Sequence, residues 1–330
     1  MPGMTKAKRR IRMKKVLALL TALICLAGLC AALAEERVPG EDTLYVTTDV
    51  VGAETVFRRY DESFYDAPSD QPGTVVKIRY EATVYEPSPI RKILYVYLPY
   101  GYDASRQYNI IYYTHGAEAH AEDLIQSAYY KNALDNMIAQ GVCEPFIFVF
   151  PSYFNDYRKK SGEVVELWPR ELLHDIMPLI ESTYSTYAET ADEAGFAASR
   201  AHRAFNGYSR GSLITWGMIG ELADYAQWFL PFSGPALGFD ASADDQFAYM
   251  SGVMETLRGK EIFIYSACGG TEDSAYPMTE MIARMIADTD HFSYGRDPGT
   301  NNLYFCLTEF PHSSTFGRFM MYNAFEVIFR

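Results

Sequence analysis

AFNGYSRGS, residues 204–212 of this 330-residue chain, holds Ser209 inside the pattern G-x-S-x-G directly after a short apolar run. In this pattern a strand turns sharply into a helix with the serine at the apex. The backbone there is so crowded that only glycine is tolerated two residues to either side. We therefore predict that Ser209 occupies a nucleophile elbow.

A nucleophilic serine needs an acid and a base, and in α/β-hydrolases these follow it along the chain in that order. The apolar segment 260–266 predicts a buried strand, and a loop that carries Glu272 and Asp273 comes just after it. A last strand, predicted at 303–307, runs into His312. Because parallel strands end at the same edge of a sheet, the acid and the base would meet there.

A further strand, predicted at 108–113, ends in THGA at residues 114–117. This is the position from which the same fold supplies the second amide of the oxyanion hole. Four pieces in the required order, each at the end of a strand, predict an α/β-hydrolase: a doubly wound, mostly parallel sheet with helices on both faces.

Several longer segments resemble the feruloyl and acetylxylan esterases of the first carbohydrate esterase family, which share their fold with esterase D and the mycolyltransferases. The resemblance covers nearly the whole chain after its amino-terminal region. The segments that carry it are YVYLPYGYD (95–103), ALDNMIA (133–139), YSTYAE (184–189), GFAASRAHRAF (195–205), FSG (232–234) and GTED (270–273).

The resemblance implies a role for each member of the site. Ser209 would be the nucleophile, Asp273 the acid and His312 the base. The backbone N–H groups of Ala117 and Arg210 would form the oxyanion hole. Glu272, which lies beside Asp273, remains an alternative acid.

Three aromatic side chains near these loops are candidates for substrate binding, namely His115, Tyr208 and Trp216. His115 also fits a structural role, in which its ring bonds to backbone near the oxyanion loop. Most other tyrosines and phenylalanines are expected in the core or in half-buried strands.

The chain departs from the family at two places. Arg210 stands where methionine is usual, and AEAHAED at 117–123 replaces a glycine-rich run. The first change keeps the backbone amide, whereas the second bears on the substrate. The Arg210 side chain is expected to pair with a nearby acid; alternatively, its guanidinium reaches the pocket rim and favours substrates that carry a carboxylate.

The first 34 residues predict a secretory signal peptide. Seven basic residues between positions 6 and 15 precede an apolar run from Val16 to about Ala31, and small residues end at Ala34, just before Glu35. The apolar run is too short, and too promptly followed by a cleavage site, for a good membrane span. We therefore expect cleavage near Ala34, secretion, and no stable membrane insertion.

Removal of residues 1–34 leaves 22 basic and 42 acidic residues, a net charge of −20. This charge argues against nucleic acid and anionic polymers as partners and favours neutral substrates. The remaining Cys143, Cys268 and Cys306 are too few for a disulfide framework. Buried thiols are expected, with a bridge between Cys268 and Cys306 as the alternative.

Residues 35–75 are polar and irregular, and they predict an extended arm that leads into a single catalytic domain at 76–330. Period-2 alternation in that domain predicts antiparallel strands first, after which helices and strands alternate. The segments concerned are strands at 75–80, 91–98 and 146–150, a helix around 134–138, and a helix from Glu171 to about Tyr184 despite Pro178.

No metal or cofactor is expected. His115 and His120, with Glu118 between them, lack the i, i+4 spacing that places two ligands on one helical face. The cysteines lack zinc spacing, and glycine-rich phosphate loops are absent from the sequence.

The sequence thus predicts a secreted serine esterase that removes feruloyl or acetyl groups from xylan, an acylated carbohydrate. The alternatives within enzymes are an acyltransferase, a siderophore or other small-ester hydrolase, and a peptidase of the same fold. The alternative outside enzymes is a catalytically inactive carbohydrate-binding relative.

Overall fold

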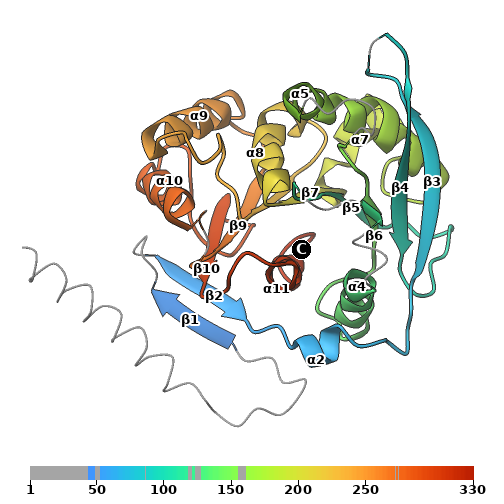
Figure 1. The fold of residues 1–330 in the computed structure, drawn as a ribbon, viewed down its shortest axis with the longest axis horizontal. Coiled ribbons are helices and arrows are strands. Elements are labelled where there is room, and N and C mark those ends of the chain that lie inside the picture. The colour runs from blue at the N-terminus through green and yellow to red at the C-terminus, as the bar shows by residue number, and fades with distance from the viewer. Residues whose placement is uncertain are drawn as a thin grey trace, which may run out of the picture. The chain divides into compact units, whose positions relative to one another are not determined.

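An eight-stranded sheet forms the centre of the computed structural model, which describes residues 44–48, 53–85, 87–117, 121–122, 128–154, 161–271, 273 and 275–330 (Figure 1). The six strands at one side of the sheet are parallel, β4 runs antiparallel to them, and the edge strand β3 pairs antiparallel with β4. From edge to edge the strands are β10 (Leu303–Thr308), β9 (Phe263–Gly269), β8 (Trp228–Phe232), β7 (Arg203–Tyr208), β5 (Asn109–Thr114), β6 (Phe146–Phe150), β4 (Ile90–Leu98) and β3 (Thr74–Ala82).

Burial along the strands explains this order. Every residue of β6, β7, β8 and β9 is buried, because helices cover both faces of the parallel part of the sheet. The outer strand β3 alternates between exposed and more buried residues over part of its length, as an antiparallel edge strand does. The predicted α/β-hydrolase fold is confirmed.

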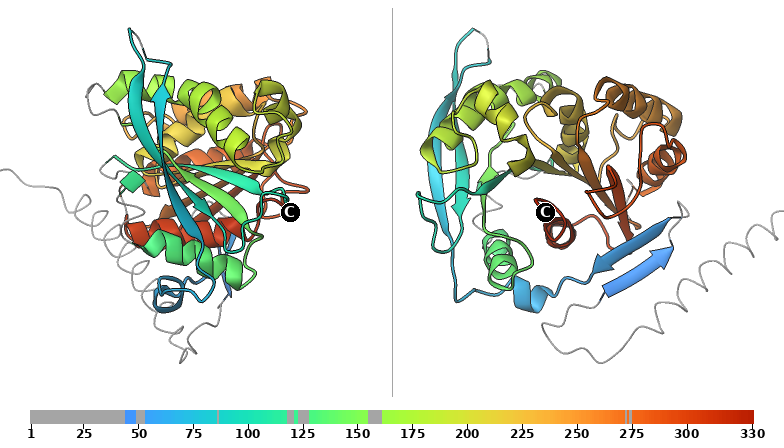
Figure 2. Two further views of the ribbon diagram at one scale, coloured as in Figure 1. Left: turned by 90° about the vertical axis from the view of Figure 1, so that its right-hand side faces the viewer. Right: turned by 180° about the vertical axis from the view of Figure 1, so that it is seen from behind.

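Helices pack on both faces of the sheet, as both views in Figure 2 show. Two hydrophobic clusters form, one on each face. The first takes side chains from α5 (Ser161–Glu171), α6 (Met177–Thr183), α7 (Glu193–Ala198), α8 (Arg210–Leu222), α9 (Ala243–Thr256) and α10 (Ala275–Ala287). The second takes side chains from α4 (Tyr129–Ala139) and α11 (Ser314–Phe325).

The expected extended arm at 35–75 is wrong in part. Its described residues form a hairpin of β1 (Leu44–Thr48) and β2 (Glu54–Arg58), followed by the short helix α2 (Glu62–Tyr65). The Tyr304 hydroxyl accepts from the Val56 N–H at 2.6 Å, and the Asn323 amide bonds both backbone groups of Arg58. These partners lie some 250 residues away in sequence. The polar composition of residues 35–75 alone therefore could not predict that the hairpin is ordered. Residues 42–330 form one compact unit.

The helix expected from Glu171 to Tyr184 is part of a longer helical stretch. A π-helical segment, Leu172–Ile176, joins α5 to α6. Pro178 is the second residue of α6 and follows the π-helical segment directly, so its missing N–H falls where the regular i→i−4 bonding of the long helix is already interrupted. The other predicted strands and the helix α4 are confirmed with small shifts at their ends.

Cys268 and Cys306 lie on adjacent strands but contribute to the clusters on opposite faces of the sheet. All three described cysteines remain thiols, so the alternative bridge between these two is wrong. The predicted signal peptide lies outside the described residues and stays a prediction. Within the described part of the chain, no helix is long and apolar enough to cross a membrane.

Candidate active site

Ser209 sits between the end of β7 and the first residue of α8. Its backbone has φ of 58° and ψ of −119°, a conformation that residues other than glycine rarely adopt. Hydrogen bonds hold it there: the Ser209 N–H donates to the Phe232 carbonyl at 2.8 Å, and the Ser209 carbonyl accepts from the Ser212 N–H at 2.9 Å. The predicted elbow is therefore present, with its strain supported by neighbouring backbone.

The two glycines of the motif are required by close approach. A Cβ on Gly207 would lie 2.1 Å from the Gly211 carbonyl oxygen, and a Cβ on Gly211 would lie 2.0 Å from the Thr114 oxygen. Both contacts are far inside van der Waals distance and involve backbone, which cannot move aside. The elbow thus packs directly against the end of β5.

The expected oxyanion loop, residues 115–117, reaches the nucleophile. A Cβ on Gly116 would lie 3.3 Å from the Cβ of Ser209, so this loop touches the serine. Ala117 follows in a turn, and Arg210 is the first residue of α8, where backbone amides lack intrahelical acceptors. The start of a helix also favours negative charge. Both amides are thus placed in the segments where the sequence predicts them.

His115 holds this loop in place. Its side chain is fully buried, with Nδ1 2.8 Å from the Gly116 carbonyl oxygen and Nε2 2.8 Å from the Ser152 hydroxyl. A carbonyl only accepts, so Nδ1 carries the proton and Nε2 accepts from the serine. The ring also stacks on Tyr153, with centroids 4.5 Å apart. The expectation that His115 contacts substrate is therefore corrected, and its alternative structural role holds.

Trp216 is likewise in the core and cannot touch a substrate. It is completely buried in α8, and its indole N–H donates to the Gly234 carbonyl at 3.0 Å. A Cβ on Gly234 would lie 2.6 Å from the Ser209 carbonyl oxygen. Trp216 thus fixes a loop behind the nucleophile, which corrects the prediction of direct binding.

Tyr208 and His312 come together at the elbow. The Tyr208 ring, 9% exposed, stacks on the His312 imidazole with centroids 4.7 Å apart and an interplanar angle of 27°. Since Tyr208 immediately precedes Ser209, this contact places the exposed His312 beside the nucleophile. Tyr208 supports the predicted base rather than facing solvent.

The loops that follow β9 and β10 run side by side. The Gly270 N–H donates to the Thr308 carbonyl at 2.5 Å, and the Thr271 hydroxyl donates to the Glu309 carbonyl at 3.5 Å. These bonds bring the acid-bearing loop to the histidine-bearing loop, as the parallel register of the two strands requires.

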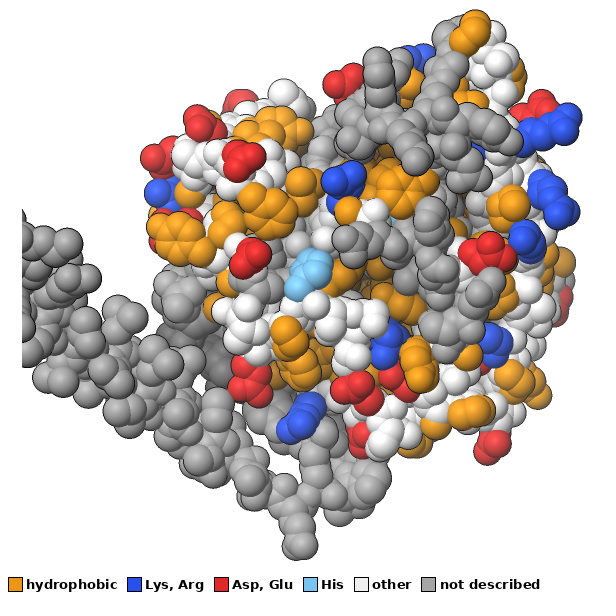
Figure 3. Space-filling model, in the orientation of Figure 1, with side chains coloured by type: hydrophobic (Ala, Val, Ile, Leu, Met, Phe, Trp, Pro, Cys, Tyr) orange, Lys and Arg blue, Asp and Glu red, His pale blue; other side chains and the backbone are white. Residues whose placement is uncertain are grey.

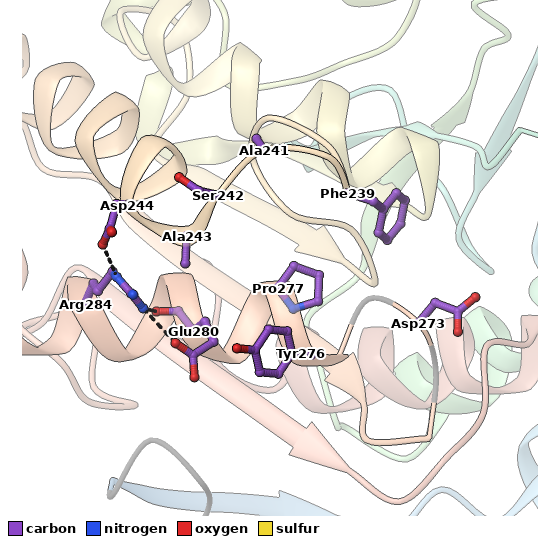
Figure 4. A pocket seen from close by; sticks show the side chains of 10 residues that line it. All are labelled: Phe239, Ala241, Ser242, Ala243, Asp244, Asp273, Tyr276, Pro277, Glu280 and Arg284. Carbon is purple, nitrogen blue, oxygen red and sulfur yellow. Dashed lines mark hydrogen bonds and ion pairs between the residues drawn. The ribbon is translucent and has the colours of Figure 1, made fainter. Parts of the chain in front are cut away.

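Asp273 is exposed in this loop, and among the described contacts no hydrogen bond joins it to His312. Its carboxylate instead lies at the border of a neighbouring cavity (Figure 4). Glu272, the alternative acid, lies outside the described residues. The identity of the acid therefore stays a prediction.

The segment that follows β6 also supports the site, although it is not among the predicted site residues. The Tyr153 hydroxyl donates to the Gly116 carbonyl at 3.2 Å, so this segment supports the oxyanion loop together with Ser152. Burial raises the pKa of Tyr153 to about 12, which keeps the hydroxyl a donor at neutral pH. The signal was available, because PSYF directly follows a buried strand whose end faces the same edge.

The Arg210 side chain does not follow the expected pairing. It is half-buried and makes no ion pair with any acidic residue that the structure describes. Its positive charge lowers the pKa of Tyr153, against the larger effect of burial, which raises it.

No group of three or more His, Cys, Asp or Glu side chains is arranged to hold a metal within the described ranges. On the face drawn in Figure 3, a histidine lies near the middle, with hydrophobic side chains gathered over α9 and α10 beside it.

Comparisons with known proteins agree with this geometry. The Esterase family model matches residues 91–215. Endo-1,4-beta-xylanase Y of Acetivibrio thermocellus is 32% identical over 268 residues, which are 80% of this chain and 24% of xylanase Y. The chain thus spans about a quarter of the length of that curated relative.

Two solved structures are similar over almost their whole length. The protein FAE is 31% identical with a TM-score of 0.72, and the match covers 81% of this chain and 91% of FAE. The feruloyl esterase module from Clostridium thermocellum, solved as a serine-to-alanine mutant complexed with sinapinate, is 29% identical with a TM-score of 0.75. That match covers 87% of this chain and 97% of the module. With its elbow, its fold and these similarities, the chain belongs to the feruloyl esterases of the first carbohydrate esterase family, which are carboxylic ester hydrolases of the α/β-hydrolase fold.

Proposed function

We propose that this protein is a secreted serine esterase that removes feruloyl or acetyl groups from xylan of the plant cell wall. The observation that carries the proposal is the strained Ser209, packed against the oxyanion loop with His312 stacked beside it on Tyr208. The similar module from Clostridium thermocellum binds sinapinate, which supports an aromatic acyl group.

In this mechanism the Ser209 Oγ attacks the ester carbonyl carbon while His312 takes the hydroxyl proton. The N–H groups of Ala117 and Arg210 bind the oxyanion of the tetrahedral intermediate, and each contributes about 3 kcal/mol to transition-state stabilisation. His312 then gives its proton to the departing sugar oxygen, and the C–O bond to the sugar breaks.

Water completes the cycle. His312 removes a proton from the water molecule, the resulting oxygen attacks the acyl-enzyme carbonyl, and Ser209 leaves with the proton returned from His312. Asp273 orients the imidazole and stabilises its cationic form. This sequence of steps uses no cofactor.

Export is part of the proposal. The charged head, the apolar run and the small residues before Glu35 support cleavage after Ala34. Amino-terminal sequencing of secreted protein tests it, and we expect Glu35 as the first residue. A secreted chain that retains residues 16–31 would contradict cleavage.

Replacement of the nucleophile tests the catalytic proposal. We expect Ser209→Ala to lower kcat on methyl ferulate by at least about 10³-fold with little change in Tm, because the hydroxyl serves chemistry rather than packing. Wild type and variant are assayed on acetyl, feruloyl and long-chain aryl esters. Ser251→Ala on α9, which loses one hydrogen bond to Asp288, is the matched control and keeps its activity. A Ser209→Ala variant that retains more than a thousandth of kcat shows that another group is the nucleophile.

A further inference from the structure

A cavity of about 590 Å³ opens at the edge of the sheet that carries the active site, between the starts of α9 and α10 (Figure 4). Its lining includes Phe239, Ser242, Asp273, Tyr276 and Arg284. The volume is that of a small-molecule site.

The cavity is connected to the nucleophile through backbone. The loop that forms one of its walls leaves β8, whose Phe232 carbonyl accepts the Ser209 N–H, and passes Gly234 against the Ser209 carbonyl. The opposite wall follows β9, the next strand in the sheet. Ser209 itself does not line the cavity. A group seated there therefore belongs to a part of the substrate that is remote from the reacting carbonyl.

Aromatic side chains project into water around this cavity. Tyr276 is 74% exposed and Phe239 is 54% exposed, and neighbouring Leu237 is 45% exposed. Phe239 precedes α9 and Tyr276 lies in the first turn of α10, and Figure 3 shows hydrophobic side chains gathered over these two helices. Exposed aromatic rings that contribute nothing to the core mark a binding surface.

The walls are held in a fixed shape before any ligand arrives. The buried Gln246 amide donates to the carbonyls of Gly238 at 3.4 Å and Ala241 at 3.1 Å, and its oxygen accepts from the Leu237 N–H at 3.5 Å. On the facing side, Arg284 bonds Asp244 at 2.6 Å and Glu280 at 2.9 Å, which links α9 to α10 (Figure 4). Such preorganisation lowers the entropic cost of binding.

The charges select the kind of ligand. The lining holds three carboxylates, those of Asp244, Asp273 and Glu280, and one guanidinium, that of Arg284. This excess of negative charge opposes an acidic ligand. Carboxylate oxygens accept hydrogen bonds from hydroxyl groups, and the aromatic rings offer faces on which the C–H side of a sugar ring packs.

We propose that this cavity binds the neutral sugar chain that carries the ester, two or more sugar units away from the acyl group. The proposal rests on the proposed function, since it assigns the carbohydrate side of the same substrate. Tyr276 and Phe239 supply the stacking faces, and the carboxylates of Asp244 and Glu280 accept sugar hydroxyls.

The test compares a small and a large ester of the same acid. Tyr276→Ala and Phe239→Ala are assayed on methyl ferulate and on a feruloylated arabinoxylo-oligosaccharide. We expect the ratio of kcat/KM for the oligosaccharide to that for methyl ferulate to fall about tenfold or more, mainly through KM. Tyr276→Phe, which keeps the ring face, retains most of the ratio.

Tyr100→Ala is the matched control, because Tyr100 is 57% exposed but follows β4, whose antiparallel direction places its end at the opposite edge of the sheet. Its ratio stays at the wild-type value. Equal losses on both esters in Tyr276→Ala would assign the cavity to the acyl group and overturn the proposal, as would no loss on either.

Binding of an unesterified xylo-oligosaccharide to Ser209→Ala, measured by calorimetry, separates this proposal from the catalytic one. We expect binding that weakens about tenfold when Tyr276→Ala is added. If wild type hydrolyses neither feruloyl nor acetyl esters, the proposed function fails while this measurement still decides the cavity. Hydrolysis of methyl ferulate together with no oligosaccharide binding overturns the cavity proposal alone.

Discussion

The nucleophile could be predicted at the scale of single residues because its requirements are local and steric. Gly207 and Gly211 stand where a Cβ would meet backbone within about 2.1 Å, so the motif itself encodes the elbow. The directions of His115 and Trp216 depend on packing against segments far along the chain, such as the loop at Ser152 and Gly234. Sequence therefore located both side chains near the site and offered the structural role of His115, but it missed that Trp216 supports the site from within.

Arg210 gives a prediction at the same scale. Arg210 is the residue next to Ser209, and its half-buried guanidinium pairs with no acidic residue in the described part of the chain, which leaves its charge for a carboxylate on a substrate. We expect Arg210→Met, which keeps the amide, to lower kcat/KM for anionic aryl esters at least tenfold, about 1.4 kcal/mol, and to leave neutral esters unchanged. Matched neutral and anionic esters of one acid provide the measurement. An equal change on both would show that the side chain does not sense substrate charge.

At the scale of elements, the strands and helices with strong hydrophobic patterns were predictable, since a fully buried strand such as Phe146–Phe150 appears in the sequence as an unbroken run of apolar residues. The β1–β2 hairpin was not, because its order comes from Tyr304 and Asn323 across the fold. Buried ion pairs and hydrogen bonds between elements could not be predicted from the sequence either. Arg203 at the start of β7 and Glu181 in α6 form a buried ion pair at 2.7 Å, and the Tyr112 hydroxyl adds a bond to the same carboxylate.

Loss of this anchor should be costly. Glu181→Gln leaves the Arg203 guanidinium buried without its counter-charge, and we expect it to lower the free energy of unfolding by about 3–5 kcal/mol. Glu81→Gln is the matched control, because it removes an exposed ion pair with Arg91 and should cost less than about 1 kcal/mol. Urea denaturation of both variants gives the values. Equal destabilisation would mean that the buried pair does not anchor α6 to the sheet.

At the scale of the whole molecule, the predicted catalytic residues all lie in loops at one edge of the sheet. The loops after β5, β7, β9 and β10 carry Ala117, Ser209, Asp273 and His312, and the parallel direction of these strands is what brings them together. The order of these loops was predictable from the sequence, whereas the cavity between α9 and α10 was not, because it depends on how two helices pack. The acidic surface, net charge −13 for the full chain, suits a neutral polysaccharide better than an anionic one.

The central claim is that His312 activates Ser209, and covalent labelling tests it most directly. Wild type and His312→Ala are treated with a fluorophosphonate, and the modified residue is identified by peptide mass spectrometry. The account predicts rapid labelling at Ser209 in wild type and a rate at least about 10³-fold lower in His312→Ala, because only a serine paired with its base is nucleophilic at neutral pH. Labelling at a different serine, or an undiminished rate in His312→Ala, would contradict it.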